Sequence, residues 1–269
     1  MRINFLFLLI LLSSMTFAQN IIVKPDFDNA SVSIEVCFPN LAEGDMFQAE
    51  VSYESQLVAL SKTSCEQPLV VEMPEDFLRW TPDHPFLYDL KVNVLRNNKP
   101  VDDAETQFAM RCIGVSRDDN GVNRFTLNHL PIFLFGMQRV NELDTVSIHE
   151  NMVAEIVRVK ALGFNMIQVN NSFEIDRLST LCDSIGLIVW KYGESEVANC
   201  LAQVPNLCLN LPSCEDIETY EKYASWLYQC VFDGISAAVF SSTIDCKFMD
   251  FDVKRLLYIN RKISHALAE

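Results

Sequence analysis

The first half of the chain alternates hydrophobic and polar residues in short runs that turn-forming residues separate. Alternation with a period of two is typical of half-buried β-strands. Seven such runs lie between residues 20 and 113: IIVKP, SVSIEVCF, FQAEVSYE, LVALSKT, PLVVEMP, LYDLKVNVL and TQFAMRCIGV. This pattern predicts an all-β sandwich of the immunoglobulin type over residues 20–113.

The pattern changes before residue 122, and from there to residue 269 continuous apolar runs alternate with helical stripes. The apolar runs are LPIFLFG, FNMIQVN, LIVWKYG, NLCLNLP and ISAAVFSS. The helical segments are DTVSIHENMVAEIVRVKALG, EIDRLSTLCDSIG, CEDIETYEKYASWLYQCVFDG and DFDVKRLLYINRKISHALAE. Strands buried on both faces that alternate with helices predict an α/β domain with a parallel sheet.

The first 18 residues combine one arginine, an apolar run from Phe5 to Leu12 and small or polar residues up to Ala18. This order predicts a secretory signal peptide that is cleaved after Ala18. The apolar run is shorter than the roughly 20 residues that a membrane span requires. We therefore expect a secreted or periplasmic protein that does not span a membrane.

Charge and cysteine content narrow the classes of partner. The formal net charge of −15 argues against nucleic acid and anionic membranes, because both attract lysine and arginine. The nine cysteines include no C-x-x-C pair, and the four histidines are scattered, so we expect no metal and no cofactor. Apolar neighbours around Cys37, Cys182 and Cys208 predict buried thiols.

Several ordered motifs carry a resemblance to a known family. W-x-P-x-x-P-x-L-Y-x-L-x-V runs from Trp80 to Val92, F-x-M-R occupies 108–111, and L-N-x-x-P-I-F-L-x-G occupies 127–136. This set resembles glycoside hydrolase family 2, which comprises the β-galactosidases, β-glucuronidases and β-mannosidases. Residues 157–173, 178–190, 235–246 and 258–262 continue the resemblance. It implies an immunoglobulin-like sandwich followed by a TIM-type (β/α) barrel with its site at the carboxyl ends of the strands.

The chain also departs from the family pattern. Residues 122–269 are fewer than the about 250 residues of a full barrel, so we expect a shortened, incomplete barrel of five strands. The family's amino-terminal sugar-binding domain is expected to be missing. Five parallel strands leave two open edges, which we expect the terminal helix 251–267 to cover or a homodimer to complete.

The resemblance also places sugar-binding residues at the strand ends. In the first strand Gln138 and Arg139 stand at family positions, and the arginine is kept. In the second strand Gln168 and Asn171 replace the family's arginine and histidine. Trp190, near the end of the third strand, is the tryptophan that we would test for stacking on a sugar.

Catalysis by a retaining glycosidase needs two carboxyl groups about 5–5.5 Å apart. The resemblance aligns Glu215 with the family's acid/base, although the sequence favours a first-turn helix acid that suits the helix dipole. Glu194 and Glu196 are the other carboxylates near a strand end, and we interpret them as a solvated loop. No second glutamate matches a nucleophile motif.

Two hypotheses follow from the sequence. The first is an exported relative of family 2 that has lost catalysis and acts in carbohydrate metabolism as a carbohydrate-binding or scaffolding module. The second is an active retaining β-glycosidase with Glu215 as acid/base.

Overall fold

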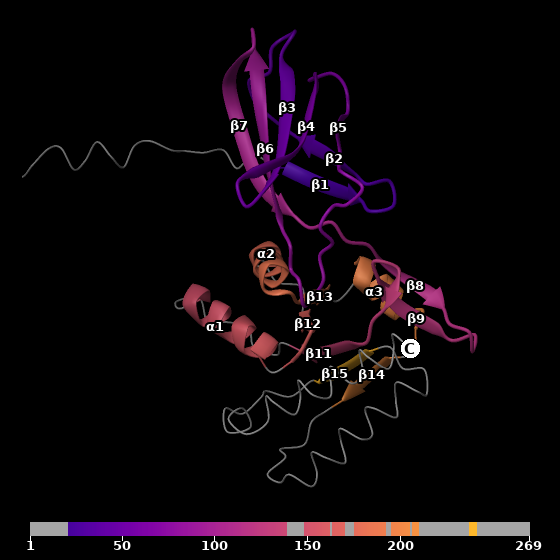
Figure 1. The fold of residues 1–269 in the computed structure, drawn as a ribbon. Helices are drawn as coiled ribbons and strands as arrows, with labels where there is room; N and C mark the ends of the chain where they lie inside the picture. Colours follow the sequence, from indigo (N-terminus) through magenta and orange to yellow (C-terminus); the bar gives the residue numbers. More distant parts are fainter. Residues whose placement is uncertain are drawn as a thin grey trace, which may run out of the picture. The chain divides into compact units, whose positions relative to one another are not determined.

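The computed structural model describes residues 21–138, 148–161, 163–169, 175–191, 195–204, 206–209 and 237–240. The expected signal peptide, the candidate residues Arg139, Asn171 and Glu215, and the expected helix 251–267 lie outside the described residues. The chain forms two compact units (Figure 1). One contains the described residues up to Phe77 together with Tyr88–Phe108, and the other contains Leu78–Leu87 and the described residues from Ala109 onward.

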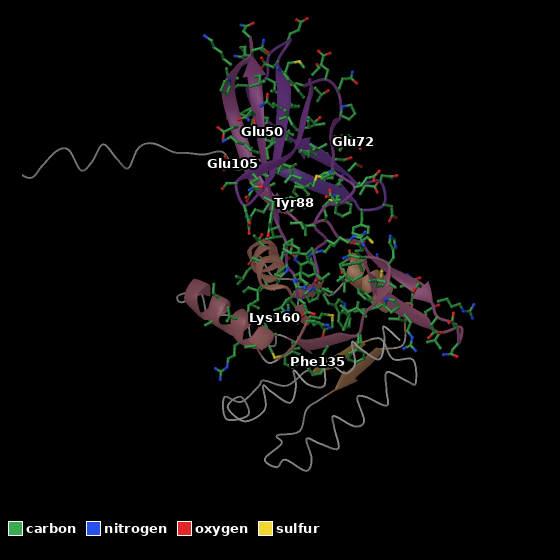
Figure 2. All side chains as sticks on the ribbon, in the orientation of Figure 1. Glu50, Glu72, Tyr88, Glu105, Phe135 and Lys160 are labelled. Carbon is green, nitrogen blue, oxygen red and sulfur yellow. The ribbon has the colours of Figure 1, made fainter. Side chains whose placement is uncertain are left out.

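The first unit confirms the expected all-β sandwich. One sheet has the order β1-β2-β5 and the other the order β4-β3-β6-β7, and all pairs are antiparallel. The strands are β1 (Ile21–Asp26), β2 (Ser31–Val36), β3 (Met46–Tyr53), β4 (Gln56–Ser64), β5 (Leu69–Glu72), β6 (Tyr88–Arg96) and β7 (Lys99–Phe108). Alternation decides which side chains are buried, so Val51 and Val92 lie in the core. Glu50 (Figure 2) lies opposite Lys91 in the β3–β6 register, on the other face of the sheet.

One strand boundary was predicted wrongly. The run 106–115 was expected to be one strand, but it contains the end of β7 and the beginning of β8 (Ile113–Arg117). β7 already begins at Lys99, after a two-residue turn in which Asn97 and Asn98 have φ values of 53° and 60°. The first half of β7 is not buried on either face, so it lacks the apolar alternation of the other strands.

Cysteine burial was predicted partly wrongly. Cys182 is buried, as expected. Cys37 is exposed, because it follows β2 directly and alternation turns Phe38 inward instead. The side chain of Cys208 is not among those that the structure describes.

The second unit is α/β with a parallel sheet, as expected. The five predicted strands are present and lie in the order β13-β12-β11-β15-β14, with every neighbouring pair parallel. They are β11 (Leu134–Gln138), β12 (Met166–Val169), β13 (Ile188–Lys191), β14 (Asn206–Leu209) and β15 (Ala237–Phe240). Chain order therefore differs from spatial order, since β14 lies at the opposite edge from β13.

Helices and a small sheet flank these strands (Figure 1). The helices are α1 (Ile148–Ala161), α2 (Ile175–Ile185) and α3 (Glu196–Leu201), and the small sheet contains β8, β9 (Asn123–Leu127) and β10 (Leu130–Pro131). The sequence did not predict α3 or the β8–β9 hairpin. No helix among the described residues is long and apolar enough to cross a membrane.

The two longer helices end as their sequences predict. Gly163 and Gly186 follow α1 and α2, and both have a φ of +87°, which favours glycine. At Gly186 a Cβ atom would also lie 2.2 Å from the carbonyl oxygen of Pro82, so close packing requires glycine there as well. On α1, Ile156 and Val159 are buried, in agreement with the predicted apolar stripe.

Residues 78–87, which separate β5 from β6, pack within the second unit, and their centre is the fully buried Trp80. The indole Nε1 of Trp80 donates to the carbonyl oxygen of Asp183 at 2.8 Å. The guanidinium of Arg111 lies 4.3 Å from the indole centroid and also pairs with the Asp183 carboxylate at 2.6 Å. The side chain of Asn128 donates to the Trp80 carbonyl. Trp80 therefore has a structural role in this unit, through packing and hydrogen bonds.

A lysine of α1 also bonds the same segment; Figure 2 labels this residue, Lys160. Lys160, near the end of α1, donates from Nζ to the carbonyl oxygens of Pro82 at 2.6 Å and Gly186 at 2.9 Å. Burial lowers the pKa of the Lys160 amine, and the negative charge of Asp83 opposes this shift. The stiff W-x-P-x-x-P stretch thus closes against α1 and the turn after α2.

We predict that Trp80→Ala lowers the free energy of unfolding by about 3–5 kcal/mol, because it empties a fully buried site. Trp80→Phe is the matched control, since it keeps most of the buried area but loses the bond to Asp183, and it should cost about 1–2 kcal/mol. Urea unfolding followed by far-ultraviolet circular dichroism measures both. A loss below about 1 kcal/mol for Trp80→Ala would contradict this role.

Candidate functional site at the ends of the parallel strands

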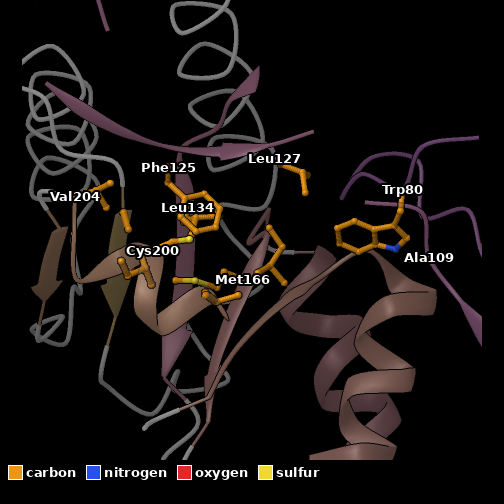
Figure 3. Close-up of a cluster of buried hydrophobic side chains, with 12 residues drawn as sticks. Trp80, Ala109, Phe125, Leu127, Leu134, Met166, Cys200 and Val204 are labelled. Atoms are coloured by element: carbon orange, nitrogen blue, oxygen red, sulfur yellow. The ribbon is translucent and has the colours of Figure 1, made fainter. Parts of the chain in front are cut away.

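One face of the parallel sheet is built in layers along the strands. Leu134 pairs with Ala237 in the first layer, and Met166 pairs with Ile188 in the next. These four residues belong to one buried apolar cluster with side chains from β9 and α3 (Figure 3). The face is therefore apolar toward the amino ends of the strands.

The next layer on this face is different in chemistry. Gln138, Gln168 and Trp190 are paired in register across β11, β12 and β13, and we call these three positions the strand-end row. Gln168 is two residues beyond Met166, so its side chain lies on the same face of the sheet. The polarity of this face thus changes at the carboxyl ends of the strands.

Gln168 is the unusual member of this row. Its side chain is only 2% exposed, and its Nε2 has no hydrogen-bond partner among the described residues. A buried amide without a partner is costly, and such groups are rare in folded proteins. An unpaired donor at a strand end is therefore a candidate ligand contact.

Asn165, which immediately precedes β12, is a buried amide with a structural role. Its Oδ1 accepts from the backbone nitrogen of Phe135 at 2.7 Å while its Nδ2 donates to the carbonyl of Phe133 at 2.8 Å. These bonds join β12 to the segment that enters β11. A buried amide beside this sheet can therefore find hydrogen-bond partners for both its oxygen and its nitrogen.

Trp190 is half-buried and packs against the apolar cluster. Its register partner is Gln168, so the indole and the amide occupy adjacent positions on one face. An indole beside a hydrogen-bond donor is suited to a ligand with both apolar and polar surface, because the ring packs on C–H groups and the donor orients a hydroxyl.

The remaining candidates are placed as follows. Gln138 is the last residue of β11 and stands in the strand-end row, where only its backbone position is described. Glu196 begins α3 as an exposed first-turn acid, next to the N-cap Ser195. Arg139, Asn171, Glu194 and Glu215 lie outside the described residues. The structure thus brings Gln138 and Trp190 together on either side of Gln168.

Two features escaped the sequence reasoning. The resemblance treats Gln168 only as the replacement of a family arginine and does not predict its burial. An amide inside the apolar run FNMIQVN is itself a signal of a buried polar position. The region around Glu196 was expected to be a loop, whereas Ser195 accepts from the backbone nitrogen of Ala198 and starts a helix. That pair of a serine N-cap and a following acid was visible in the sequence.

The amino-acid sequence is similar to known proteins of one family. Residues 16–111 match the family model of glycosyl hydrolases family 2. A β-galactosidase from Thermoanaerobacter pseudethanolicus is 28% identical over 119 residues, which cover 42% of this chain and 15% of that protein. The match confirms the resemblance that the motifs from Trp80 to Arg111 indicated.

Solved structures agree with this relationship in fold. An FMN-binding β-glucuronidase from Facaelibacterium prausnitzii L2-6 aligns with a TM-score of 0.52 and 18% identity, over 93% of this chain and 38% of that chain. A β-glucuronidase from Ruminococcus gnavus aligns with a TM-score of 0.52 and 14% identity, over 87% of this chain and 44% of that chain. The present chain therefore spans less than half the length of these relatives.

We predict opposite stability effects for the two buried amides. Gln168→Leu removes an unpaired donor and should raise the free energy of unfolding by about 1 kcal/mol, whereas Asn165→Leu breaks satisfied bonds and should lower it by about 2–4 kcal/mol. Urea titration of both variants measures the difference. If Gln168→Leu is as destabilising as Asn165→Leu, the Gln168 side chain is a structural group.

Proposed function

We propose that this chain, a relative of the family 2 glycosyl hydrolases, binds a carbohydrate at its strand-end row and does not hydrolyse it. The observation that carries the proposal is the buried Gln168 amide, whose Nε2 lacks a partner among the described residues and whose register neighbour is Trp190. A sugar offers hydroxyl acceptors for the amide and C–H groups for the indole. The family relationship supports a sugar as the ligand class.

We further propose that the parallel sheet is a shortened version of the family's (β/α) barrel. Pairing of β15 with β11 supports this, because the last strand of a closed barrel lies beside the first. In such a barrel the carboxyl ends of the strands carry the ligand site, and the strand-end row lies there.

The absence of hydrolysis is inferred from the groups that the chain offers. A retaining site needs two carboxyl groups on either side of the bond. Among the described residues, the five parallel strands end in Gln138, Val169, Lys191, Leu209 and Phe240, and none is acidic. Glu215 remains the single residue that the family motif aligns with a catalytic carboxylate, so acid/base and nucleophile are not both supplied.

Export is part of the proposal. The amino-terminal pattern that ends at Ala18 supports delivery across a membrane. A carbohydrate-binding role outside the cytoplasm is compatible with the acidic composition, which disfavours binding to nucleic acid. The carbohydrate would then be met in the periplasm or outside the cell.

We predict no measurable turnover of aryl β-galactoside, β-glucuronide or β-mannoside, because loss of a catalytic carboxylate removes either proton transfer or covalent trapping. Release of the chromophore over many hours, with purified protein at high concentration, measures this. Turnover that Glu215→Gln abolishes would contradict the prediction and support an active β-glycosidase. Turnover that this variant leaves unchanged indicates a contaminating enzyme.

We predict that the full chain binds glycans in an array and that Gln168→Leu weakens binding of any retained glycan by about tenfold, as expected for one hydrogen bond. Gln107→Leu is the matched control, because Gln107 is a glutamine of β7 in the other unit that donates to Asp89. Isothermal titration of the glycan into each variant gives the affinities. Equal affinities for wild type and Gln168→Leu would exclude the strand-end row as the site.

A further inference from the structure

A cysteine that directly precedes β8 and a histidine in the turn between β9 and β10 lie beside each other in the second unit. The Sγ of Cys112 lies 3.7 Å from Nε2 of His129, within hydrogen-bonding distance for sulfur. Cys112 is half-buried and His129 is exposed. A thiol beside an imidazole is a pair that can share a proton and form a thiolate.

The backbone holds this pair together. His129 and Asn128 form the two-residue turn between β9 and β10, with φ values of 67° and 53°. Asn128 is buried, and its backbone nitrogen donates to the Cys112 carbonyl at 2.8 Å while its side-chain oxygen accepts from the Cys112 nitrogen at 3.1 Å. The same side chain donates to the carbonyl of the buried Trp80. The turn that carries the imidazole is thus tied to the residue that carries the thiol.

We propose that Cys112 is a modification site that exchanges with small disulfides, and that His129 activates it. The thiolate sulfur of Cys112 attacks one sulfur of the disulfide, the disulfide bond breaks and a mixed disulfide forms at Cys112. The second half of the small disulfide leaves as a thiolate and takes the proton that His129 held. Cys112 is oxidised and the leaving thiol is reduced, so the small disulfide is the only oxidant required.

Two other cysteines provide comparisons within the same molecule. Cys37 is exposed, and the structure gives it no hydrogen-bond partner among the described residues. Cys65 is half-buried, and burial together with the nearby charges of Asp45 and Glu66 raises the pKa of its thiol. Exposure alone would make Cys37 react first, whereas activation by an imidazole makes Cys112 react first.

The test is the rate of mixed-disulfide formation at each cysteine of the native chain with 2,2′-dithiodipyridine, a neutral disulfide, at pH 7. Peptide mapping by mass spectrometry at successive times assigns each rate. We expect Cys112 to react ahead of Cys37 and Cys65, and His129→Asn to slow Cys112 by about threefold or more through loss of thiolate. Asparagine is chosen because it tolerates the positive φ of this turn.

Controls separate activation from a change of fold. His84→Gln replaces another exposed histidine and should leave the Cys112 rate unchanged. The reaction of Cys37 serves as the internal standard in each variant. The proposal is overturned if Cys37 reacts before Cys112 in the wild-type chain, or if His129→Asn leaves the Cys112 rate unchanged. The first outcome needs no variant, so it decides the question even if His129→Asn folds poorly.

Discussion

The second unit is organised around the burial of one indole. The Asp183 carbonyl and the Arg111 guanidinium contact the Trp80 indole, and the Asn128 amide bonds the Trp80 backbone carbonyl, so three separate parts of the unit contact one residue. The bonds to Asp183 and Asn128 satisfy polar groups that burial would otherwise leave costly. The carbonyl oxygen of Pro82 accepts a hydrogen bond from Lys160 and packs closely against Gly186. The proline-rich stretch therefore has little conformational freedom. The unit therefore depends on a segment that the chain supplies between two strands of the sandwich.

The parallel sheet places two buried amides in opposite circumstances. Asn165 sits near the amino end of β12 and is fully used in joining strands, which favours stability. Gln168 sits near the carboxyl end, and its donor has no partner among the residues that the structure describes, which costs stability. Proteins tolerate such costs at ligand sites, where the bound molecule supplies the missing partner. The contrast between the residue before β12 and a residue within it is the physical basis of the proposed binding site.

The relationship to the glycosyl hydrolases is uneven along the chain. The family match covers residues 16–111, which contain the sandwich and the Trp80 motif. Beyond it, the polar residues at the strand ends differ from the family pattern, and Gln168 replaces an arginine. The matched part therefore includes Trp80 and Arg111, which pack against each other in the second unit, whereas the strand-end row of the proposed binding site lies outside the match.

Local sequence determined much of this protein. Alternation was sufficient for the strands of the sandwich, and apolar runs between helical stripes were sufficient for the five parallel strands, because burial on one or both faces leaves a direct imprint on residue type. The polar first half of β7 escaped, since its residues are not buried on either face and therefore carry no such imprint. Only the tertiary structure decided that β14 pairs with β15, that Trp80 packs beside Asp183, and that the Gln168 amide, next to Trp190, finds no partner for its Nε2 within the described part of the chain. These are contacts between residues far apart in the chain, and they arise from packing and hydrogen-bond satisfaction that no local pattern records.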